Sequence, residues 1–257
     1  MNLITSRDNP QVKAWRRLAQ DTTAYRKAGQ FWLEGDHLCR AAVDRGVKPL
    51  QVVLSASCFE EQGSQWAGST DALFVLPDTL FASLSGLESP ARMGFVVAWS
   101  AQRQVLSDAS TVVLDRLQDA GNVGAILRCA SAFGYRQVLA IKGTAALWSP
   151  KVLRAGMGAH FGLHLVESVD DAEIATLQVP ILTTSSHEGP FLHELLQCNK
   201  LTPRCAWVLG HEGQGVSQNL MALAGQKVRI AQPGGEESLN VATAAAICLH
   251  ASATARI

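Results

Sequence analysis

AWVLGHEGQGVS, residues 206–217, is an apolar run that breaks into a glycine-rich loop. Its uninterrupted apolar start predicts a strand buried on both faces, as in a parallel sheet covered by helices. Three glycines let the loop backbone approach a ligand closely, and Glu212 places a carboxylate at the end of the strand. Because an ordinary turn needs only one or two glycines, this loop is a candidate binding site.

Similar apolar strands alternate with helical stretches through the C-terminal part of the chain. The predicted strands are TVVLD (111–115), QVLAI (137–141), HLVE (164–167), PILTT (180–184) and KVRIA (227–231). The predicted helices are GNVGAILRCASAFG (121–134), SPKVLRAGMGA (149–159) and SLNVATAAAICLHASAT (238–254). This alternation predicts an α/β domain with a parallel sheet and helices on both faces, in which ligands bind at the carboxyl ends of the strands.

The first hundred residues predict a smaller α/β unit. Its predicted helices are NPQVKAWRRLAQ (9–20), DHLCRAAVDRG (36–46) and DTLFASLSG (78–86). Its predicted strands are FWLEG (31–35), LQVVLS (50–55), ALFVLP (72–77) and MGFVVAW (93–99), and a Gly/Ser-rich stretch at 63–71 separates its two halves. A polar stretch at 100–110 is typical of a linker, so we expect two domains, 1–105 and 106–257.

Composition excludes several classes of protein. Apolar residues make up 47% and charged residues 17% of the chain, which favours a folded protein over a disordered one. No run approaches the roughly 18 apolar residues of a membrane helix, and the N-terminus is too polar for a signal peptide, so we expect a cytoplasmic protein with no membrane partner. Six dispersed cysteines indicate neither a disulfide framework nor a zinc site, and we expect no metal.

The net formal charge is zero, which by itself disfavours a nucleic-acid partner. The charge is unevenly distributed, however. Residues 1–50 hold nine Lys and Arg against five Asp and Glu, whereas residues 51–100 hold one against five. Aromatic residues interleave the basic ones near the N-terminus, a pattern that fits RNA contact and equally a solvated helix face anchored in the core.

Two further clusters carry candidate functional residues. In GNVGAILR (121–128), Asn122 can cap a helix whose amides face an anion, and Arg128 can fork onto a phosphate. A capped helix with an ion-paired arginine is the alternative for this cluster. In VRIAQPGGEESLNVA (228–242), Ser238 and Asn240 stand at the start of a small-residue helix, either as helix caps or as side chains facing a ligand.

In this order, N-x-x-G-x-x-x-R, L-G-x-E-G-x-G-x-S and I-x-x-x-x-x-x-x-S-L-N-V-A resemble the three motifs of the SpoU, or TrmH-like, branch of the SPOUT RNA methyltransferases. The resemblance covers roughly residues 110–255. The N-terminal unit is similar to the family's L30e-like RNA substrate-binding domain, and SPARMG (89–94) fits the usual end of that domain. The resemblance implies a SPOUT domain with a deep trefoil knot, which breaks the general rule against knots, and a homodimer formed through that domain.

The resemblance also implies a cofactor, S-adenosyl-L-methionine, held by the loops of the second and third motifs. The cofactor-binding residues it implies are Leu209, Gly210, Glu212, Gly213, Ile230, Ser238 and Leu239. The catalytic residues it implies are Arg128, Asn122, Glu212, Ser238 and Asn240.

The implied reaction is attack by a ribose 2'-hydroxyl on the methyl group of a sulfonium ion. In the family the counterpart of Arg128 is proposed as the base, but a guanidinium is a poor base. The alternative is that Arg128 clamps the target phosphate and stabilises the developing alkoxide. The other four catalytic candidates would then orient Arg128 and the ribose.

Ribosomal RNA is the expected substrate, because an L30e-like domain is commoner among ribosomal-RNA enzymes; transfer RNA is the alternative. A non-catalytic RNA-binding assembly factor is disfavoured because both Arg128 and the Ser-Leu-Asn motif are present. A base methyltransferase is disfavoured because the motifs match the ribose branch. A dinucleotide-dependent dehydrogenase is disfavoured because the glycines at 156–162 follow no predicted strand and are spaced one residue too far.

The chain departs from the family pattern at two places. The third motif often reads Ile-Pro-Met, and here Ala231 and Gln232 replace its last two residues. In the second motif, His211 is unusual between Gly210 and Glu212. Both departures could alter the packing of the cofactor loops, and neither removes a residue expected to act chemically.

Overall fold

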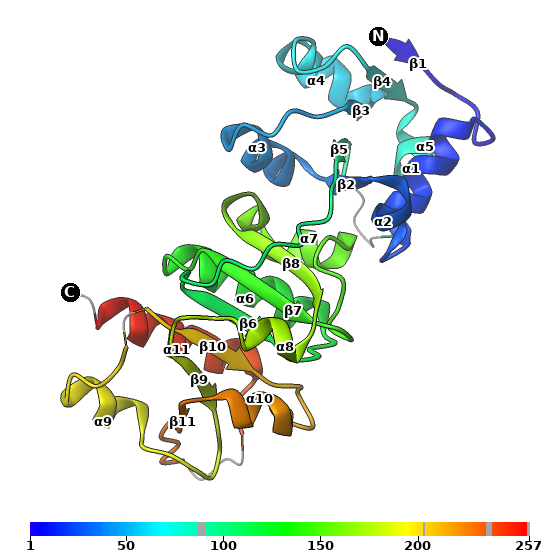
Figure 1. Cartoon of the computed structure of the whole chain (residues 1–257). Coiled ribbons are helices and arrows are strands. Elements are labelled where there is room, and N and C mark those ends of the chain that lie inside the picture. Colours follow the sequence, from blue (N-terminus) through cyan, green and yellow to red (C-terminus); the bar gives the residue numbers. More distant parts are fainter. Residues whose placement is uncertain (87–90, 203, 235–237, 256–257) are drawn as a thin grey trace. The chain divides into compact units, whose positions relative to one another are not determined.

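The computed structural model of the chain describes residues 1–86, 91–202, 204–234 and 238–255 (Figure 1). The chain divides into two compact units, Met1–Ala101 with Trp148–Phe161, and Gln102–Leu147 with Gly162–Ile257. The segment Trp148–Phe161 therefore groups with the first unit, although it lies between two stretches of the second in sequence.

A five-stranded mixed sheet forms the centre of the first unit, in the order β1-β4-β3-β5-β2. Its strands are β1 Asn2–Leu3, β2 Gln30–Glu34, β3 Gln51–Ser55, β4 Leu73–Leu76 and β5 Met93–Ala98. Strand β5 pairs antiparallel with both β2 and β3, whereas β4 pairs parallel with β1 and β3. The four strands predicted for this unit are therefore confirmed.

The helices of the first unit before β5 are α1 Pro10–Gln20, α2 Ala24–Ala28, α3 Asp36–Asp44, α4 Ala56–Trp66 and α5 Asp78–Ala82. The prediction that a Gly/Ser-rich separator begins at residue 63 is wrong, because α4 continues through Gly63 to Trp66. Ser55 caps this helix, and Trp66 is buried. Capping and burial outweigh the weak helix propensity of glycine.

The core of the first unit lies between α1, α5 and the sheet and includes Trp15, Trp32 and Phe81. Gly94 is required there, because a Cβ at this position would lie 2.2 Å from the Trp32 ring. Of the expected domain end, SPARMG, Ser89 and Pro90 lie outside the described residues.

Helix α7, Pro150–Gly156, forms where a helix is predicted, and it packs on β2 of the first unit. The Ser149 side chain caps it by accepting a hydrogen bond from the Val152 amide. Just before the helix, the Trp148 ring lies 4.8 Å from the Phe31 ring, between centroids. A short 3-10 helix, Ala159–Gly162, follows.

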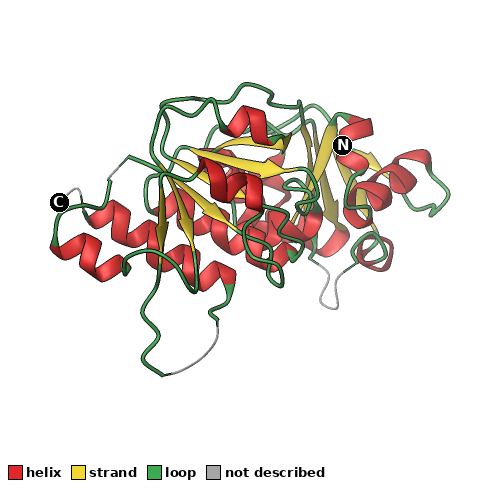
Figure 2. Cartoon of the chain, turned by 60° about the horizontal axis from the view of Figure 1, so that its bottom comes forward, coloured by secondary structure: helices red, strands yellow, loops and turns green. Residues whose placement is uncertain are grey.

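A six-stranded sheet forms the centre of the second unit, in the order β11-β9-β10-β6-β7-β8. Figure 2 shows the strands of the structure in yellow and its helices in red. Its strands are β6 Thr111–Leu114, β7 Gln137–Ile141, β8 His164–Val169, β9 Ile181–Thr184, β10 Ala206–Leu209 and β11 Gln226–Val228. All five strand pairs are parallel, as the sequence predicts.

The helices of the second unit are α6 Ala120–Ala132, α8 Asp171–Ile174, α9 Leu192–Gln197, α10 Gln218–Leu223 and α11 Val241–Thr254. They cover both faces of the sheet. Val208 of β10 packs in one cluster with Ile174 of α8 and Leu220 of α10. Its neighbour Trp207 points to the opposite face, where its Nε1 donates to the Ser252 hydroxyl of α11 at 2.9 Å.

Helix α11 also packs along α6, so the C-terminal helix lies against the first helix of its unit (Figure 1). The predicted α/β architecture is confirmed. The trefoil knot stays a prediction.

Candidate active site

The candidate site lies at the carboxyl ends of the strands of the second unit. Because all strands of this sheet are parallel, the loops that follow β6, β10 and β11 leave from one edge of it. The strand order reverses between β6 and β10: the chain proceeds from β6 outward to β7 and β8, then crosses to β9 on the far side of β10. Parallel α/β sheets bind ligands at such a reversal, so the loops after β6 and β10 form the expected place for a site.

The first turn of α6 begins with Asp119, which caps the helix by accepting a hydrogen bond from the Asn122 amide at 2.7 Å. The prediction that Asn122 caps this helix is therefore wrong. Asn122 is the third helical residue, and a cap must have a non-helical backbone. Its side chain is consequently available for other contacts.

A chain of hydrogen bonds joins residues from all three motifs. Asn240 Nδ2 donates to Asn122 Oδ1 at 3.0 Å, and Asn122 Nδ2 donates to Glu212 Oε1 at 3.2 Å. Asn240 Oδ1 caps α11 by accepting from the amides of Ala242 and Thr243. Because its oxygen caps the helix, Asn240 directs its amino group to Asn122. The side-chain amides of Asn240 and Asn122 therefore each have one orientation that satisfies these hydrogen bonds.

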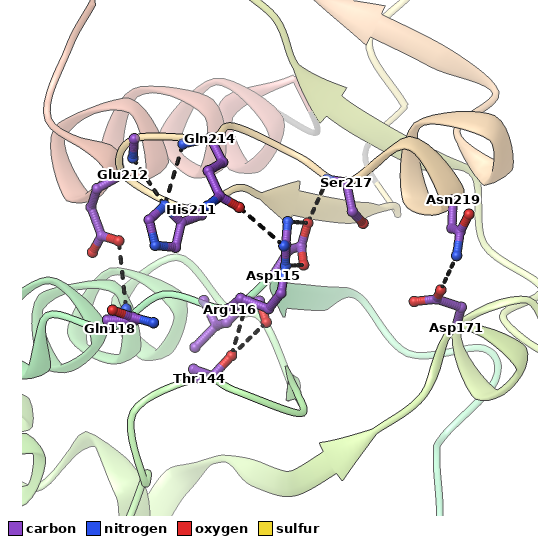
Figure 3. Close-up of polar contacts among 12 residues, drawn as sticks. Asp115, Arg116, Gln118, Thr144, Asp171, His211, Glu212, Gln214, Ser217 and Asn219 are labelled. Carbon is purple, nitrogen blue, oxygen red and sulfur yellow. Dashed lines mark hydrogen bonds and ion pairs between the residues drawn. The ribbon is translucent and has the colours of Figure 1, made fainter.

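Glu212 is the acceptor at the end of this chain, and its carboxylate also accepts longer hydrogen bonds from the amides of Gln118 and Asp119, at 3.5 and 3.4 Å (Figure 3). Partial burial raises the pKa of Glu212, but hydrogen bonds from its own amide, from Asn122 and from these two amides outweigh burial. The pKa of Glu212 is lowered as a result. An ionised carboxylate with its oxygens so engaged acts as a hydrogen-bond acceptor and is a poor proton acceptor.

The second-motif loop closes on itself. His211 and Gly215 exchange backbone hydrogen bonds of 3.0 and 2.8 Å, and His211 Nδ1 accepts from the amides of Gly213 and Gln214 (Figure 3). The turn is so tight that a Cβ on Gly210 would lie 2.2 Å from the backbone of Gly215 and Val216. The unusual His211 therefore stabilises the loop through its ring.

Asp115, which is not among the site residues predicted from the sequence, joins this loop to the end of β6. Only 1% of its surface is exposed. It accepts from the Ser217 amide at 2.6 Å and from Arg116 Nε at 2.8 Å (Figure 3). The bond to Asp115 raises the pKa of the Arg116 guanidinium. A charged residue directly after an uninterrupted apolar strand is the signal that identifies Asp115 as a candidate.

Arg116 connects the end of β6 to two further loops. Its Nη1 donates to Gln214 Oε1 at 3.2 Å, and its amide donates to the Thr144 hydroxyl at 3.1 Å (Figure 3). Its φ is +59°, a left-handed conformation that is uncommon outside glycine. Contacts with the loops after β7 and β10 therefore hold an unfavourable backbone conformation in place at the edge of the sheet.

Arg128 lies in the second half of α6 with an exposed side chain. Six residues after Asn122, it is about 120° around the helix from that residue. Among the described residues no group forms a hydrogen bond or ion pair with the side chain of Arg128. The ion-paired alternative considered for this arginine thus finds no support there, and the guanidinium is available to a ligand.

The candidate cofactor residues lie on the same edge. Leu209 is the buried last residue of β10, Gly213 is exposed in the loop, and Ile230 is half-buried just after β11. Ser238 and Leu239 are exposed and directly precede Asn240, the cap of α11. The stretch Gly235-Glu236-Glu237 of the third motif lies outside the described residues.

Gln232 lies in the third-motif segment after β11. Its side-chain oxygen Oε1 is buried and accepts no hydrogen bond from any described residue. Buried polar atoms without a partner are rare in folded proteins, and binding of a ligand or a water molecule is one explanation for such an atom.

Neither a metal site nor a membrane segment is found in the described part of the chain. No group of three or more His, Cys, Asp or Glu side chains there is placed to hold a metal ion. No described helix is long and apolar enough to cross a membrane.

Two family models match the chain. Residues 109–250 match the model of the SpoU rRNA Methylase family, which spans more than half of the chain. Residues 9–94 match the model of the MRM3-like substrate binding domain.

Curated relatives and solved structures match over nearly the full length. The 23S rRNA (guanosine(2553)-2'-O)-methyltransferase RlmP of Bacillus subtilis is 27% identical, over 97% of this chain and 98% of its own. The 23S rRNA (uridine(2479)-2'-O)-methyltransferase of Streptomyces viridochromogenes is 26% identical, over 99% of this chain and 92% of its own. A crystal structure of an RNA 2'-O ribose methyltransferase superposes with a TM-score of 0.80 at 26% identity, covering 99% of each chain.

Proposed function

Since this chain belongs to the SpoU rRNA methylase family, we propose that it is an S-adenosyl-L-methionine-dependent RNA 2'-O-ribose methyltransferase that acts on ribosomal RNA. Two relatives of similar length are named as 23S rRNA 2'-O-methyltransferases, which supports ribosomal over transfer RNA as the substrate. Residues 106–257 would form the methyltransferase domain, and residues 1–105 would bind the RNA substrate, in line with the substrate-binding model that matches there.

The hydrogen-bond chain Asn240–Asn122–Glu212 carries the proposal. These three side chains come from three different motifs and meet at the strand reversal, where a parallel sheet binds its ligands. A purely structural link would not need one residue of each motif at that place.

The residues at this edge fit the proposed cofactor. Gly213 leaves exposed backbone after β10, the buried Gly210 lets the loop close tightly on Gly215, and Ile230 and Leu239 offer apolar side chains. Gln232 adds a buried hydrogen-bond acceptor without a partner in the described chain. Leu209, Glu212 and Ser238 would complete the set that holds the cofactor. When bound, S-adenosyl-L-methionine supplies a methyl group on a positively charged sulfur, whose departure needs no acid.

The work of the protein is then to align the ribose and to stabilise charge on its 2'-oxygen. Arg128, with its unengaged guanidinium, would clamp the target phosphate by a bidentate contact and stabilise the developing alkoxide, while the proton of the 2'-hydroxyl would pass to solvent water. Asn122 and Asn240 would orient the ribose through their fixed amides, assisted by Ser238. Glu212, with its lowered pKa, would stay ionised and hold Asn122 in position.

We further propose a cytoplasmic homodimer with a trefoil knot in the second unit. Helix α11 is rich in alanine, which permits close helix packing, and it carries the exposed apolar residue Ile247. Light scattering at micromolar protein should give twice the chain mass of 27.5 kDa. A mass of one chain would contradict the dimer.

Methyl transfer in vitro tests the function. The purified protein, incubated with S-adenosyl-L-methionine carrying a labelled methyl group, should label ribosomal RNA from cells that lack the protein and leave RNA from normal cells unlabelled. Calorimetry on the same preparation should show binding of S-adenosylhomocysteine. If a folded protein neither binds this product nor labels any RNA, the enzymatic function is wrong.

A further inference from the structure

Gln232 has an unusual environment for a glutamine. The residue is half-buried, and its Oε1 is fully buried without a hydrogen bond from any described residue. Burying an amide oxygen without a donor costs free energy, because the oxygen loses its hydrogen bonds to water. A side chain that keeps this arrangement in the free protein is positioned for a donor that arrives with a ligand.

The surroundings along the chain indicate which kind of donor. Ala231, Pro233 and Gly234 are uncharged and small, and the nearby Ile230 is apolar. The neighbouring cation, Arg229, is engaged elsewhere, since its Nε donates to the Gly189 carbonyl at 2.7 Å and its guanidinium lies 4.0 Å from the centre of the Phe191 ring. A neutral acceptor in such a segment suits the N–H of a flat, uncharged base, whereas an ammonium or a carboxylate would favour charged partners.

We propose that the side-chain oxygen of Gln232 accepts a hydrogen bond from the exocyclic amine of the adenine of the methyl donor. Gln232 would then determine the specificity for adenine over purines that lack the amine. This inference rests on the proposed function, since it assigns the adenine to the segment after β11. It also gives a role to a departure from the family pattern, because the methionine often found at this position has only a weak thioether acceptor.

A thermodynamic cycle on the full-length protein tests the contact. The probes are S-adenosylhomocysteine and its analogue whose purine carries hydrogen in place of the 6-amino group. The variants are wild type and Gln232→Met, an unbranched side chain of similar length that cannot act as a strong acceptor. Calorimetry gives the four dissociation constants, and the cycle isolates the coupling between the amine and residue 232.

Removal of the amine should weaken binding to wild type about tenfold or more, and binding to Gln232→Met about twofold or less. Gln232→Glu keeps a hydrogen-bond acceptor and should still bind the analogue more weakly than S-adenosylhomocysteine. This variant is measured in place of Gln232→Met if the latter does not fold. Gln226→Met is the matched control, because Gln226 is half-buried on β11, before the carboxyl edge. It should discriminate as wild type does.

The same loss of affinity in wild type and in Gln232→Met would overturn the assignment of the amine to Gln232. Equal binding of the two ligands to wild type would overturn it without any variant. These outcomes differ from failure of the proposed function, in which S-adenosylhomocysteine would not bind to folded wild-type protein at all.

Discussion

Asn240 Nδ2 lies 3.0 Å from Asn122 Oδ1, although the two residues are 118 positions apart in the chain. The contact joins the cap of the last helix to the first turn of the first helix in the same unit. Because Asn240 uses its oxygen to cap α11 and its amino group to hold Asn122, one side chain fixes both the start of a helix and the orientation of a candidate catalytic residue.

Asn240→Asp separates these two tasks. Aspartate caps a helix as well as asparagine does, so the melting temperature should change by no more than about 2 °C. The new carboxylate cannot donate to Asn122, and methyl transfer should fall about tenfold or more. Asn9→Asp makes the same exchange at the cap of α1 and should leave methyl transfer unchanged. Wild-type activity of Asn240→Asp would show that the contact does not serve catalysis.

Low pH should weaken the hydrogen bonds that the Glu212 carboxylate accepts from the loop after β6, because it protonates the carboxylate. Its pKa is lowered in the folded protein, so its ionised form stabilises the fold at pH values above the ordinary value of 4.5, and that stabilisation is lost as the pH falls through the lowered pKa. The difference in unfolding free energy between wild type and Glu212→Gln should therefore be constant from pH 6 to 8 and shrink below about pH 4.5. Denaturant titrations at several pH values measure it. Glu60→Gln, at an exposed position of the first unit, is the control. A difference in unfolding free energy between wild type and Glu212→Gln that stays constant down to pH 3 would contradict the role of ionisation.

Asp115→Ala should destabilise the second unit by about 2 kcal/mol, because the buried carboxylate holds the Ser217 amide and Arg116. For a unit of this size the corresponding drop in melting temperature is about 4–8 °C. Asp115→Asn keeps one hydrogen-bond acceptor, so its melting temperature should fall less than that of Asp115→Ala. Asp108→Ala, at an exposed position, should cost almost nothing. Equal melting temperatures for Asp115→Ala and Asp108→Ala would show that Asp115 does not stabilise the second unit.

Arg128 variants distinguish a phosphate clamp from a base. Arg128→Ala should lower single-turnover methyl transfer about 1000-fold while the affinity for S-adenosylhomocysteine changes less than twofold. Arg128→Lys keeps the charge without the bidentate contact, and a clamp predicts partial activity that rises little with pH. A base predicts activity that climbs steeply as the lysine deprotonates, since a free lysine has a pKa of about 10.4. Arg136→Ala, exposed before β7, is the control; normal turnover of Arg128→Ala would show that the active site lies elsewhere.

The sequence was sufficient to predict the parallel sheet, because its strands are uninterrupted apolar runs and lie between clear helical stretches. It was insufficient for α8, α9 and α10, each of four to six residues. Helices this short are stabilised by packing and capping contacts that the surrounding structure supplies, and they show little periodicity of their own. Helix α7 was predicted as a helix, but its packing on β2 depends on tertiary contacts that local patterns do not encode.

The candidate site, like the fold, could be predicted from the sequence only in part. The three motifs predicted the candidate site residues, and three of these, Asn122, Glu212 and Asn240, lie in one series of hydrogen bonds. The cap of α6 was misassigned because Asp119 and Asn122 are both good capping residues and only the backbone conformation decides between them. The orphaned oxygen of Gln232 could not be predicted at all, since burial of a single atom depends on the path of the whole loop.

Mapping of ribose methylation in ribosomal RNA tests whether this protein methylates a ribose in that RNA. RNA is prepared from cells that lack this protein and from the same cells supplied with wild type or with Arg128→Ala, and resistance to alkaline cleavage reports each 2'-O-methyl group. We predict that one ribosomal RNA nucleotide resists cleavage in cells with the wild-type protein and is cleaved in cells with Arg128→Ala or with no protein. Identical cleavage patterns in all three, or a methyl group found by mass spectrometry on a base in place of the ribose, would contradict it.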